Sequence, residues 1–186
     1  KVYMNMMNKS VALMHIGNRP IEEGMNILGA HIDSPRLDLK QNPLYEDGEI
    51  AYFDTHYYGG VKKYQWVTIP LAIYGVVCLK DGSTIEIEVG DKEEDSVFVI
   101  SDLLVHLSAD QMQKKASEVI EGENLNVTVG SIPLNEEEKE PVKANILKLL
   151  KNKYGFEEED FISAELEVVP SGKARSCGFD ESMILG

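Results

Sequence analysis

The chain has 186 residues, 43% of them hydrophobic, which is enough for one medium domain or two small ones with a buried core. Its net charge of −14 disfavours nucleic acid and anionic membrane surfaces as partners, because both are bound through clustered Lys and Arg. No apolar run approaches the roughly 18 residues that a membrane-spanning helix needs, and the residues after Lys1 do not resemble a signal peptide.

The two cysteines, Cys78 and Cys177, are far apart and form no Cys-x-x-Cys motif. This pattern favours a reducing, cytoplasmic setting, with both cysteines as small buried apolar residues. The chain begins with Lys and ends in the apolar run Ser-Met-Ile-Leu-Gly. We therefore expect both ends to be cuts within a longer protein.

The first forty residues contain two short apolar runs, at 10–17 and 25–32, separated by a polar turn. They predict two neighbouring strands, with His15 as an ordinary sheet residue. Residues 41–60 are rich in aromatic residues and are interrupted by Pro and Gly. They predict a connection between domains followed by a loop.

The middle of the chain predicts a β region at 66–91, with a hairpin turn at Asp81-Gly82 and alternating buried and exposed residues after it. Residues 101–121 predict a helix that begins at Ser101 and places His106 on its surface or in the core.

Three further elements complete the chain. Residues 124–134 alternate as a strand, and residues 136–155 predict a second helix with Pro141 in its first turn and Gly155 at its end. From residue 160 the chain returns to the alternation of a strand and then enters a Pro-Ser-Gly loop.

The strongest chemical signal is the end of the second apolar run, where His31 follows Ile27-Leu28-Gly29-Ala30 and Asp33 comes two residues later. A histidine at the carboxyl end of a buried strand stands where open sheets bind ligands. Asp33 can accept the N–H of the ring nitrogen that faces away from a metal, which orients the imidazole. A purely structural hydrogen bond between the two residues explains the spacing equally well.

The full string around His31, "GMNILGAHIDSPRLDLK", resembles the segment around the first metal-binding histidine of the aspartyl aminopeptidase and aminopeptidase I family of zinc metallopeptidases. Three other segments resemble, in order, the strands before that histidine, the aromatic Gly-Gly stretch that opens an inserted dimerisation domain, and the return to the peptidase domain. They are "KVYMNMMNKSVALMHIGNRPIEEG", "YYGGVKKYQWVTIPLAIYGVV" and "AELEVVPSGKARSCGFDESMI".

The resemblance implies an α/β fold, in which a partial peptidase-domain sheet carries an inserted, β-rich α+β dimerisation domain. Residues 1–45 and 166–186 would belong to the metallopeptidase catalytic domain. Residues 46–165 would be the inserted dimerisation domain. The complete enzyme would be a homo-oligomer with a dimer as its building block.

The resemblance also implies a site with two divalent ions, zinc or alternatively cobalt or manganese, which activate a water that attacks the first peptide bond of a peptide substrate. His31 corresponds to the first ligand and Asp33 to its orienting carboxylate. Asp180 is a candidate for the bridging aspartate, although the family has a similar Gly-aromatic-Asp some residues before that ligand. The other ligands and the general base have no counterpart here, so we expect a fragment of a cytosolic aminopeptidase that is inactive by itself.

Lys62 and Lys63 occupy positions where many relatives carry a Trp-His-Thr-Trp type of sequence, whose histidine reaches into a partner's active site. If this loop crosses the interface here, a lysine meets the substrate; otherwise both are solvated loop charges. Two other functions stay open at this point. The first alternative is an oligomerisation or interaction module without catalysis. The second is an acidic ligand-binding domain that is unrelated to peptidases and in which His31 has a structural role.

Overall fold

The computed structural model describes residues 1–7, 9–135 and 138–185, and its backbone divides into two compact units, residues 1–34 and residues 35–186. Each unit is described by itself below. None of the described helices has both the length and the apolar character that crossing a membrane requires.

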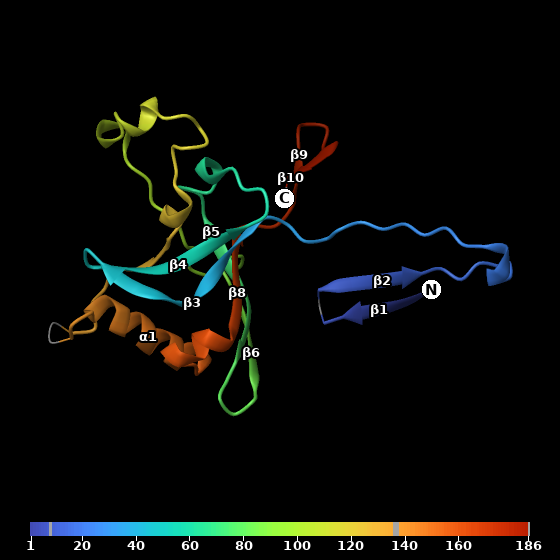
Figure 1. Ribbon diagram of the computed structural model, residues 1–186, viewed down its shortest axis with the longest axis horizontal. Coiled ribbons are helices and arrows are strands. Elements are labelled where there is room, and N and C mark those ends of the chain that lie inside the picture. Colours follow the sequence, from blue (N-terminus) through green and yellow to red (C-terminus); the bar gives the residue numbers. More distant parts are fainter. Residues whose placement is uncertain (8, 136–137, 186) are drawn as a thin grey trace. The chain divides into compact units, whose positions relative to one another are not determined.

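The first unit is a hairpin followed by a segment without strands. β1 (Val2–Met6) pairs antiparallel with β2 (Ser10–Met14), and a single 3-10 turn, η1 (Ile21–Glu23), comes before residues 24–34, which Figure 1 draws as an extended trace. The strand predicted at 10–17 is confirmed for residues 10–14, and His15 lies just beyond it, exposed. The strand predicted at 25–32 is wrong for this structure. A strand needs a hydrogen-bonding neighbour, and β1 and β2 pair with each other.

The second unit is built on a curled antiparallel sheet with the strand order β6-β5-β8-β3-β4-β7, and β9 and β10 form a separate hairpin near the end of the chain (Figure 1). The strands are β3 (Arg36–Asp47), β4 (Ile50–Tyr58), β5 (Leu71–Cys78), β6 (Thr84–Val89), β7 (Val127–Gly130), β8 (Ala164–Pro170), β9 (Arg175–Cys177) and β10 (Met183–Leu185). Short hairpins join β3 to β4 and β5 to β6, whereas parallel strands need long crossovers. The described sheet is therefore antiparallel, as suits the β-rich part of the expected fold, and the described residues form no parallel α/β sheet.

Two predicted domain boundaries fall inside strands of this sheet. β3 runs through residues 45 and 46, and β8 runs through residues 165 and 166. The pairing of Leu37 with Val168 joins β3 to β8, and both residues are fully buried. Residues 36–45 and 166–170 thus share one core with the region predicted as the inserted domain.

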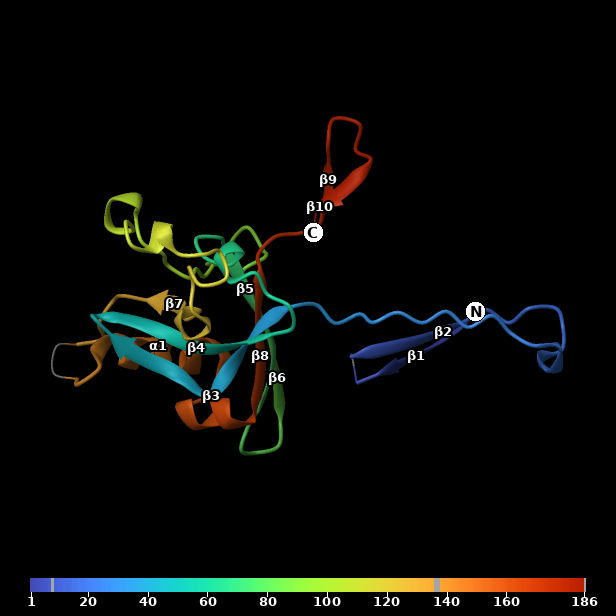
Figure 2. The same ribbon diagram turned by 45° about the horizontal axis from the view of Figure 1, so that its top comes forward.

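Residues 41–60 form the β3–β4 hairpin, so the predicted connection and loop are wrong. Ala51, Phe53 and Thr55 point inward and are buried, which is strand alternation that the dense aromatic residues obscured. Gly48 and Glu49 both have positive φ, at 57° and 64°, as a tight two-residue hairpin turn requires. In the middle of β3, between Leu39 and Leu44, the pairing register with β4 shifts, and the strand bends (Figures 1 and 2).

The only α-helix among the described residues is α1 (Pro141–Tyr154), which confirms the helix predicted at 136–155, although residues 136–137 lie outside the described part. Pro141 occupies the first turn, and Gly155 ends the helix in the left-handed region at φ 81°. Figure 2 shows α1 beside β3 and β4, and Val142 on its inner side is buried in the core.

The helix predicted at 101–121 is wrong. Only short 3-10 turns occur there, η3 (Val105–Leu107) and η4 (Gln111–Gln113), and His106 is exposed. Leu103, Leu104 and Leu107 are mostly exposed, so the apolar stripe that would support a helix is not buried against the rest of the unit. The remaining 3-10 turns are η2 (Lys63–Gln65), η5 (Gly122–Asn124) and η6 (Glu158–Ser163).

Other local predictions are confirmed. Asp81-Gly82 lies in the β5–β6 turn, and residues 127–130 of the strand predicted at 124–134 form β7. The cysteines are free, as expected, but Cys78 is exposed and Cys177 is half-buried. Cys78 is the last residue of β5, where the strand leaves the core, so its burial was wrongly predicted.

Candidate metal-binding residues

His31 and Asp33 contact each other within the first unit, as predicted. His31 Nδ1 lies 3.1 Å from the backbone oxygen of Asp33 and 3.3 Å from its Oδ1. Both oxygens are acceptors, so Nδ1 carries the proton and donates to them. The neutral imidazole then has its lone pair on Nε2, the nitrogen that a metal would bind. The side chain of His31 is 86% exposed, which leaves this nitrogen open.

A complete metal site is not formed within the described residues, where no three His, Cys, Asp or Glu side chains lie close enough together to hold an ion. A zinc site takes four ligands, and even catalytic sites take three of them from protein. One imidazole with an orienting carboxylate does not meet this requirement. The residues present therefore fit a single ligand of a site and not a whole one, and the ligand role of His31 stays a prediction.

Asp180 lies in the second unit, in the turn between β9 and β10. Its Oδ1 accepts a 3.3 Å hydrogen bond from the backbone N–H of Ser182, and hydrogen bonds from Ser182 hold the pKa of Asp180 below its usual range. This contact is that of an aspartate that closes a turn on its own backbone. Among the residues that the structure describes, Asp180 belongs to no group of three or more His, Cys, Asp or Glu side chains that could hold a metal ion.

Lys62 and Lys63 lie where the chain leaves β4, at the beginning of η2. Lys62 is exposed, whereas Lys63 is half-buried and its Nζ lies 5.9 Å from the centre of the Tyr57 ring, a cation–π contact. Lys63 also borders a concavity of about 480 Å³ together with Lys114 and Glu121. These contacts hold Lys63 against its own unit, and a substrate role for either lysine stays a prediction.

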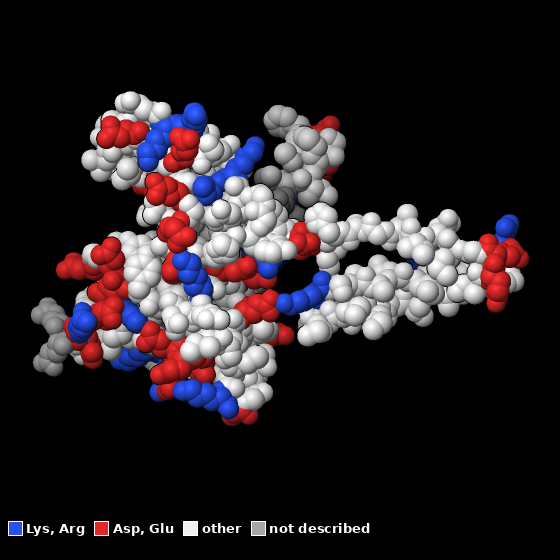
Figure 3. All heavy atoms as spheres, in the orientation of Figure 1, with Lys and Arg blue, Asp and Glu red and all other residues white. Residues whose placement is uncertain are grey.

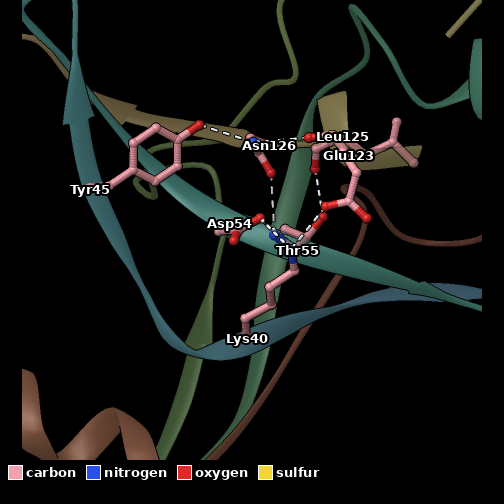
Figure 4. Close-up of polar contacts among 7 residues, drawn as sticks. All are labelled: Lys40, Tyr45, Asp54, Thr55, Glu123, Leu125 and Asn126. Carbon is pink, nitrogen blue, oxygen red and sulfur yellow. Dashed lines mark hydrogen bonds and ion pairs between the residues drawn. The ribbon is translucent and has the colours of Figure 1, made fainter. Parts of the chain in front are cut away.

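A network of polar contacts joins residues 123–126 to strands β3 and β4 (Figure 4). No motif in the sequence predicts this network. Lys40 Nζ lies 3.0 Å from Asp54 Oδ1 and 3.1 Å from Glu123 Oε2, and hydrogen bonds to Asp54 and then Glu123 raise the pKa of Lys40. Asn126 Nδ2 donates to the hydroxyl of Tyr45 at 2.9 Å. Lys40 and Glu123 are 83 residues apart in sequence, and Tyr45 and Asn126 are 81 apart, so no local pattern predicts these two contacts.

Comparison with known proteins adds the identity of the family. A family model described as aminopeptidase I zinc metalloprotease (M18) matches residues 1–186. The chain is 60% identical to a probable M18 family aminopeptidase 1 of Clostridium acetobutylicum, over 100% of this chain and 40% of that protein. It is 53% identical to the corresponding protein of Thermotoga maritima, over 98% of this chain and 40% of the relative.

A solved structure of aminopeptidase I from Clostridium acetobutylicum matches with a TM-score of 0.88 and 58% identity, covering 98% of this chain and 40% of that one. The chain thus spans about two fifths of the length of these relatives. The alternative of an acidic ligand-binding domain unrelated to peptidases is overturned by these matches. The chain belongs to the aminopeptidase I (M18) family of zinc metalloproteases.

Proposed function

We propose that this chain is part of a metal-dependent aminopeptidase that removes N-terminal residues from peptides, and that His31 is one of its metal ligands, oriented by Asp33. The observation that carries the proposal is the pair of acceptors at His31 Nδ1, because they hold the proton of a neutral imidazole on that nitrogen and leave the other, exposed nitrogen, Nε2, to face a metal. Membership of a zinc metalloprotease family supports the same role.

The remaining ligands and the general base belong, in this proposal, to polypeptide outside these residues. The family resemblance implies two divalent ions, zinc or alternatively cobalt or manganese, that activate the attacking water. No step of that reaction is assigned to the described residues, because one imidazole does not complete a site. The chain by itself is therefore inactive in this proposal.

We also propose that the complete enzyme is cytoplasmic and homo-oligomeric, with residues 46–165 contributing to the dimer. The free cysteines suit a reducing compartment. Tyr57, Tyr58 and Tyr64 are each about two fifths exposed on the second unit, and exposed aromatic residues are common anchors of protein interfaces. The same surface supports the second candidate, an interaction module whose role in this chain is assembly.

The first experiment assays the purified chain with a chromogenic amino-acid amide in the presence of zinc, cobalt or manganese. The intact Clostridium acetobutylicum relative under the same conditions is the positive control. The chain should show no turnover while the control hydrolyses the amide. Metal-dependent turnover by the chain would mean that its residues complete a site, and Asp180 would be the first residue to substitute.

The second experiment tests the ligand directly in a chimera, in which this chain replaces the matched part of the Clostridium acetobutylicum protein. His31→Ala should lower bound metal and amide hydrolysis, and Asp33→Asn should weaken metal affinity by about 10- to 100-fold. His15→Ala is the matched control, because His15 is an exposed histidine of the same unit. Equal metal content in His31→Ala and His15→Ala would refute the ligand role.

Assembly is measured by light scattering on the chain and on the chimera. An oligomer in the chimera that Tyr58→Ser weakens would support the proposed interface. A chimera that stays monomeric while it hydrolyses the amide would remove assembly from the proposal and leave the catalytic role in place.

A further inference from the structure

A cavity of about 180 Å³ lies in the second unit, between α1 and the inner face of the sheet. Twelve of its fifteen lining residues are aliphatic or Phe, and they come from five strands, from η6, from α1 and from the loops beside them. The other three, Ser96, Lys153 and Tyr154, carry polar groups. Close-packed protein cores have few spaces larger than one water molecule, so a cavity of this size is unusual.

The inner wall of the cavity is fixed by aromatic packing. Phe161 packs edge-on against Phe53 and against Phe156, with ring centres 5.6 Å and 5.3 Å apart. All three residues are at most 5% exposed. Rings that interlock in this way in a close-packed core keep their rotamers, so they do not turn inward to fill the space. The cavity is therefore already formed before any molecule enters it.

The rim of the cavity is open to solvent and carries one charge. Ser96, Leu149 and Lys153 are exposed, whereas the aromatic wall behind them is buried. Among the lining residues, all of which belong to the described part of the chain, Lys153 alone is charged. Its Nζ lies 5.1 Å from the centre of the Tyr154 ring, at the same rim. A molecule that fits the cavity thus meets apolar groups inside and an ammonium group at the entrance.

We propose that this cavity binds a medium-chain carboxylate, with its alkyl chain among the apolar residues and its carboxylate beside Lys153. An apolar cavity of about 150 Å³ stays dry and binds benzene, so the volume here suits a chain of about six to eight carbon atoms. This site goes beyond the proposed function, because it uses neither His31 nor a metal.

The α1 side of the lining favours an extended chain over a single ring. Ile146, Leu150 and Tyr154 recur every fourth residue, so they lie along one face of the helix. Eight residues of α-helix extend over about 12 Å, and this is the length of wall that the three residues provide. An extended octanoate chain follows such a wall over most of its length, whereas one aromatic ring contacts only part of it.

The charge of the second unit makes other sites for a carboxylate unfavourable. Residues 1–34 contain three basic and three acidic residues, so the net charge of −14 lies in residues 35–186. Figure 3 shows acidic side chains spread over the visible face of this unit. Asp95 interacts electrostatically with Lys153, but its carboxylate also accepts the backbone N–H of Gly90 at 3.0 Å. An anion that binds in spite of this negative field depends on the cavity and on Lys153.

The experiment titrates the 186-residue chain with butanoate, hexanoate, octanoate and decanoate in a calorimeter. Each CH₂ group that enters the cavity should lower Kd by about four-fold. The decrease should stop near octanoate, where the cavity is full. Octanoate should also raise the melting temperature of the chain, because a molecule that binds only the folded state stabilises it.

A first pair of variants tests the place of binding. Val129→Phe puts a ring into the cavity from β7 and should abolish octanoate binding. Val97→Phe is the matched control, at a 53% exposed residue outside the lining, and should leave Kd unchanged. Ser96→Trp blocks the exposed rim and should also abolish binding, which provides the same test if Val129→Phe does not fold. Circular dichroism shows which variants keep the fold.

A second pair of variants tests the head group. Lys153→Gln should weaken octanoate binding by about two- to five-fold and leave the binding of uncharged octanol unchanged. Lys148→Gln, at an exposed lysine of the same helix outside the lining, should change neither. Equal effects of the two substitutions on octanoate would refute the contact with Lys153 and overturn the proposal of a carboxylate.

The remaining outcomes decide the cavity itself. The proposal is overturned if octanoate shows no saturable binding to the unaltered chain, or if Val129→Phe and Ser96→Trp both fold and still bind it. A Kd that keeps falling four-fold per CH₂ beyond decanoate would indicate adsorption to an open surface, and also overturns it. None of these results depends on metal binding at His31, so the proposed function is tested separately.

Discussion

The carboxylate of Glu46 in β3 accepts a 2.9 Å hydrogen bond from the backbone N–H of Val142, ninety-six residues away in the first turn of α1. The same oxygen accepts a second bond of 2.9 Å from the N–H of Lys143. The first N–H groups of a helix have no partner within the helix, and a carboxylate there also interacts favourably with the helix dipole. Glu46 thus caps α1 from the sheet, whereas the side chain of the N-cap residue, Glu140, makes no capping hydrogen bond.

Glu46→Ala should lower the free energy of unfolding by about 1 to 2 kcal/mol, because two amides at the half-buried helix start lose their acceptor. Urea unfolding followed by circular dichroism measures the change. Glu86→Ala, an exposed glutamate on β6, is the control and should stay within about 0.5 kcal/mol of the unaltered chain. Equal losses of unfolding free energy in Glu46→Ala and Glu86→Ala would mean that removing a negative charge explains the effect, and that the two hydrogen bonds of Glu46 do not.

Thr55 makes a second long-range contact, and removing it should lower the free energy of unfolding by a predictable amount. Its buried hydroxyl donates a 2.6 Å hydrogen bond to the backbone oxygen of Leu125 (Figure 4). Thr55→Val keeps the shape but leaves that oxygen without its donor, so the unfolding free energy should fall by about 1 to 3 kcal/mol. Thr55→Ser keeps the hydroxyl and should lose less unfolding free energy than Thr55→Val. A larger loss in Thr55→Ser than in Thr55→Val would mean that the methyl group of Thr55, and not its hydrogen bond, provides the stability.

Gly75 allows the backbones of β5 and β8 to approach each other closely at the centre of the sheet. A Cβ at this position would lie 1.9 Å from the backbone oxygen of Glu165 in β8, and its φ of +146° is unfavourable for other residues. Gly75→Ala should therefore lower the unfolding free energy by more than about 3 kcal/mol or prevent folding. Gly82→Ala, in an open turn, should cost only about 1 kcal/mol for its positive φ. Similar melting temperatures for the two variants would contradict the predicted clash.

The pH dependence of stability should contain a contribution from Asp91. The hydroxyl of Tyr74 donates to this carboxylate, and together with the backbone N–H of Gly172 at 2.7 Å it lowers the pKa of Asp91. The folded pKa lies below the unfolded value, so the stabilisation is present above that unfolded value and is lost as the pH falls through the folded pKa. The same contact raises the pKa of Tyr74 to about 12.

Tyr74→Phe removes this donor, so the difference in unfolding free energy between it and the unaltered chain should be larger at about pH 7 than at about pH 2. Urea titrations at both pH values measure the difference. Tyr64→Phe, an exposed tyrosine in η2, is the control and should show no such pH dependence. A difference for Tyr74→Phe that is constant with pH would mean that the contact does not favour ionised Asp91.

Local features were predictable because their cause lies within a few neighbouring residues. The turn at Asp81-Gly82, the helix between Pro141 and Gly155 and the contact of His31 with Asp33 each depend on residues close in sequence. Residues 101–121 and 25–32 carry equally clear patterns, yet neither forms the expected element. In both cases the described residues provide no surface or strand for the apolar side chains to pack on.

The sequence by itself determined the family, the turns, α1 and the His31–Asp33 pair, since these follow from side-chain chemistry over short spacings. Only the tertiary structure decided that β3 lies between β8 and β4, that Glu46 caps α1 and that Lys40 joins Asp54 to Glu123. The physical reason is that strand neighbours and long-range hydrogen bonds depend on which distant surfaces bury each other. Hydrophobic burial is non-directional, so an apolar pattern predicts that a face will be covered and does not name what covers it.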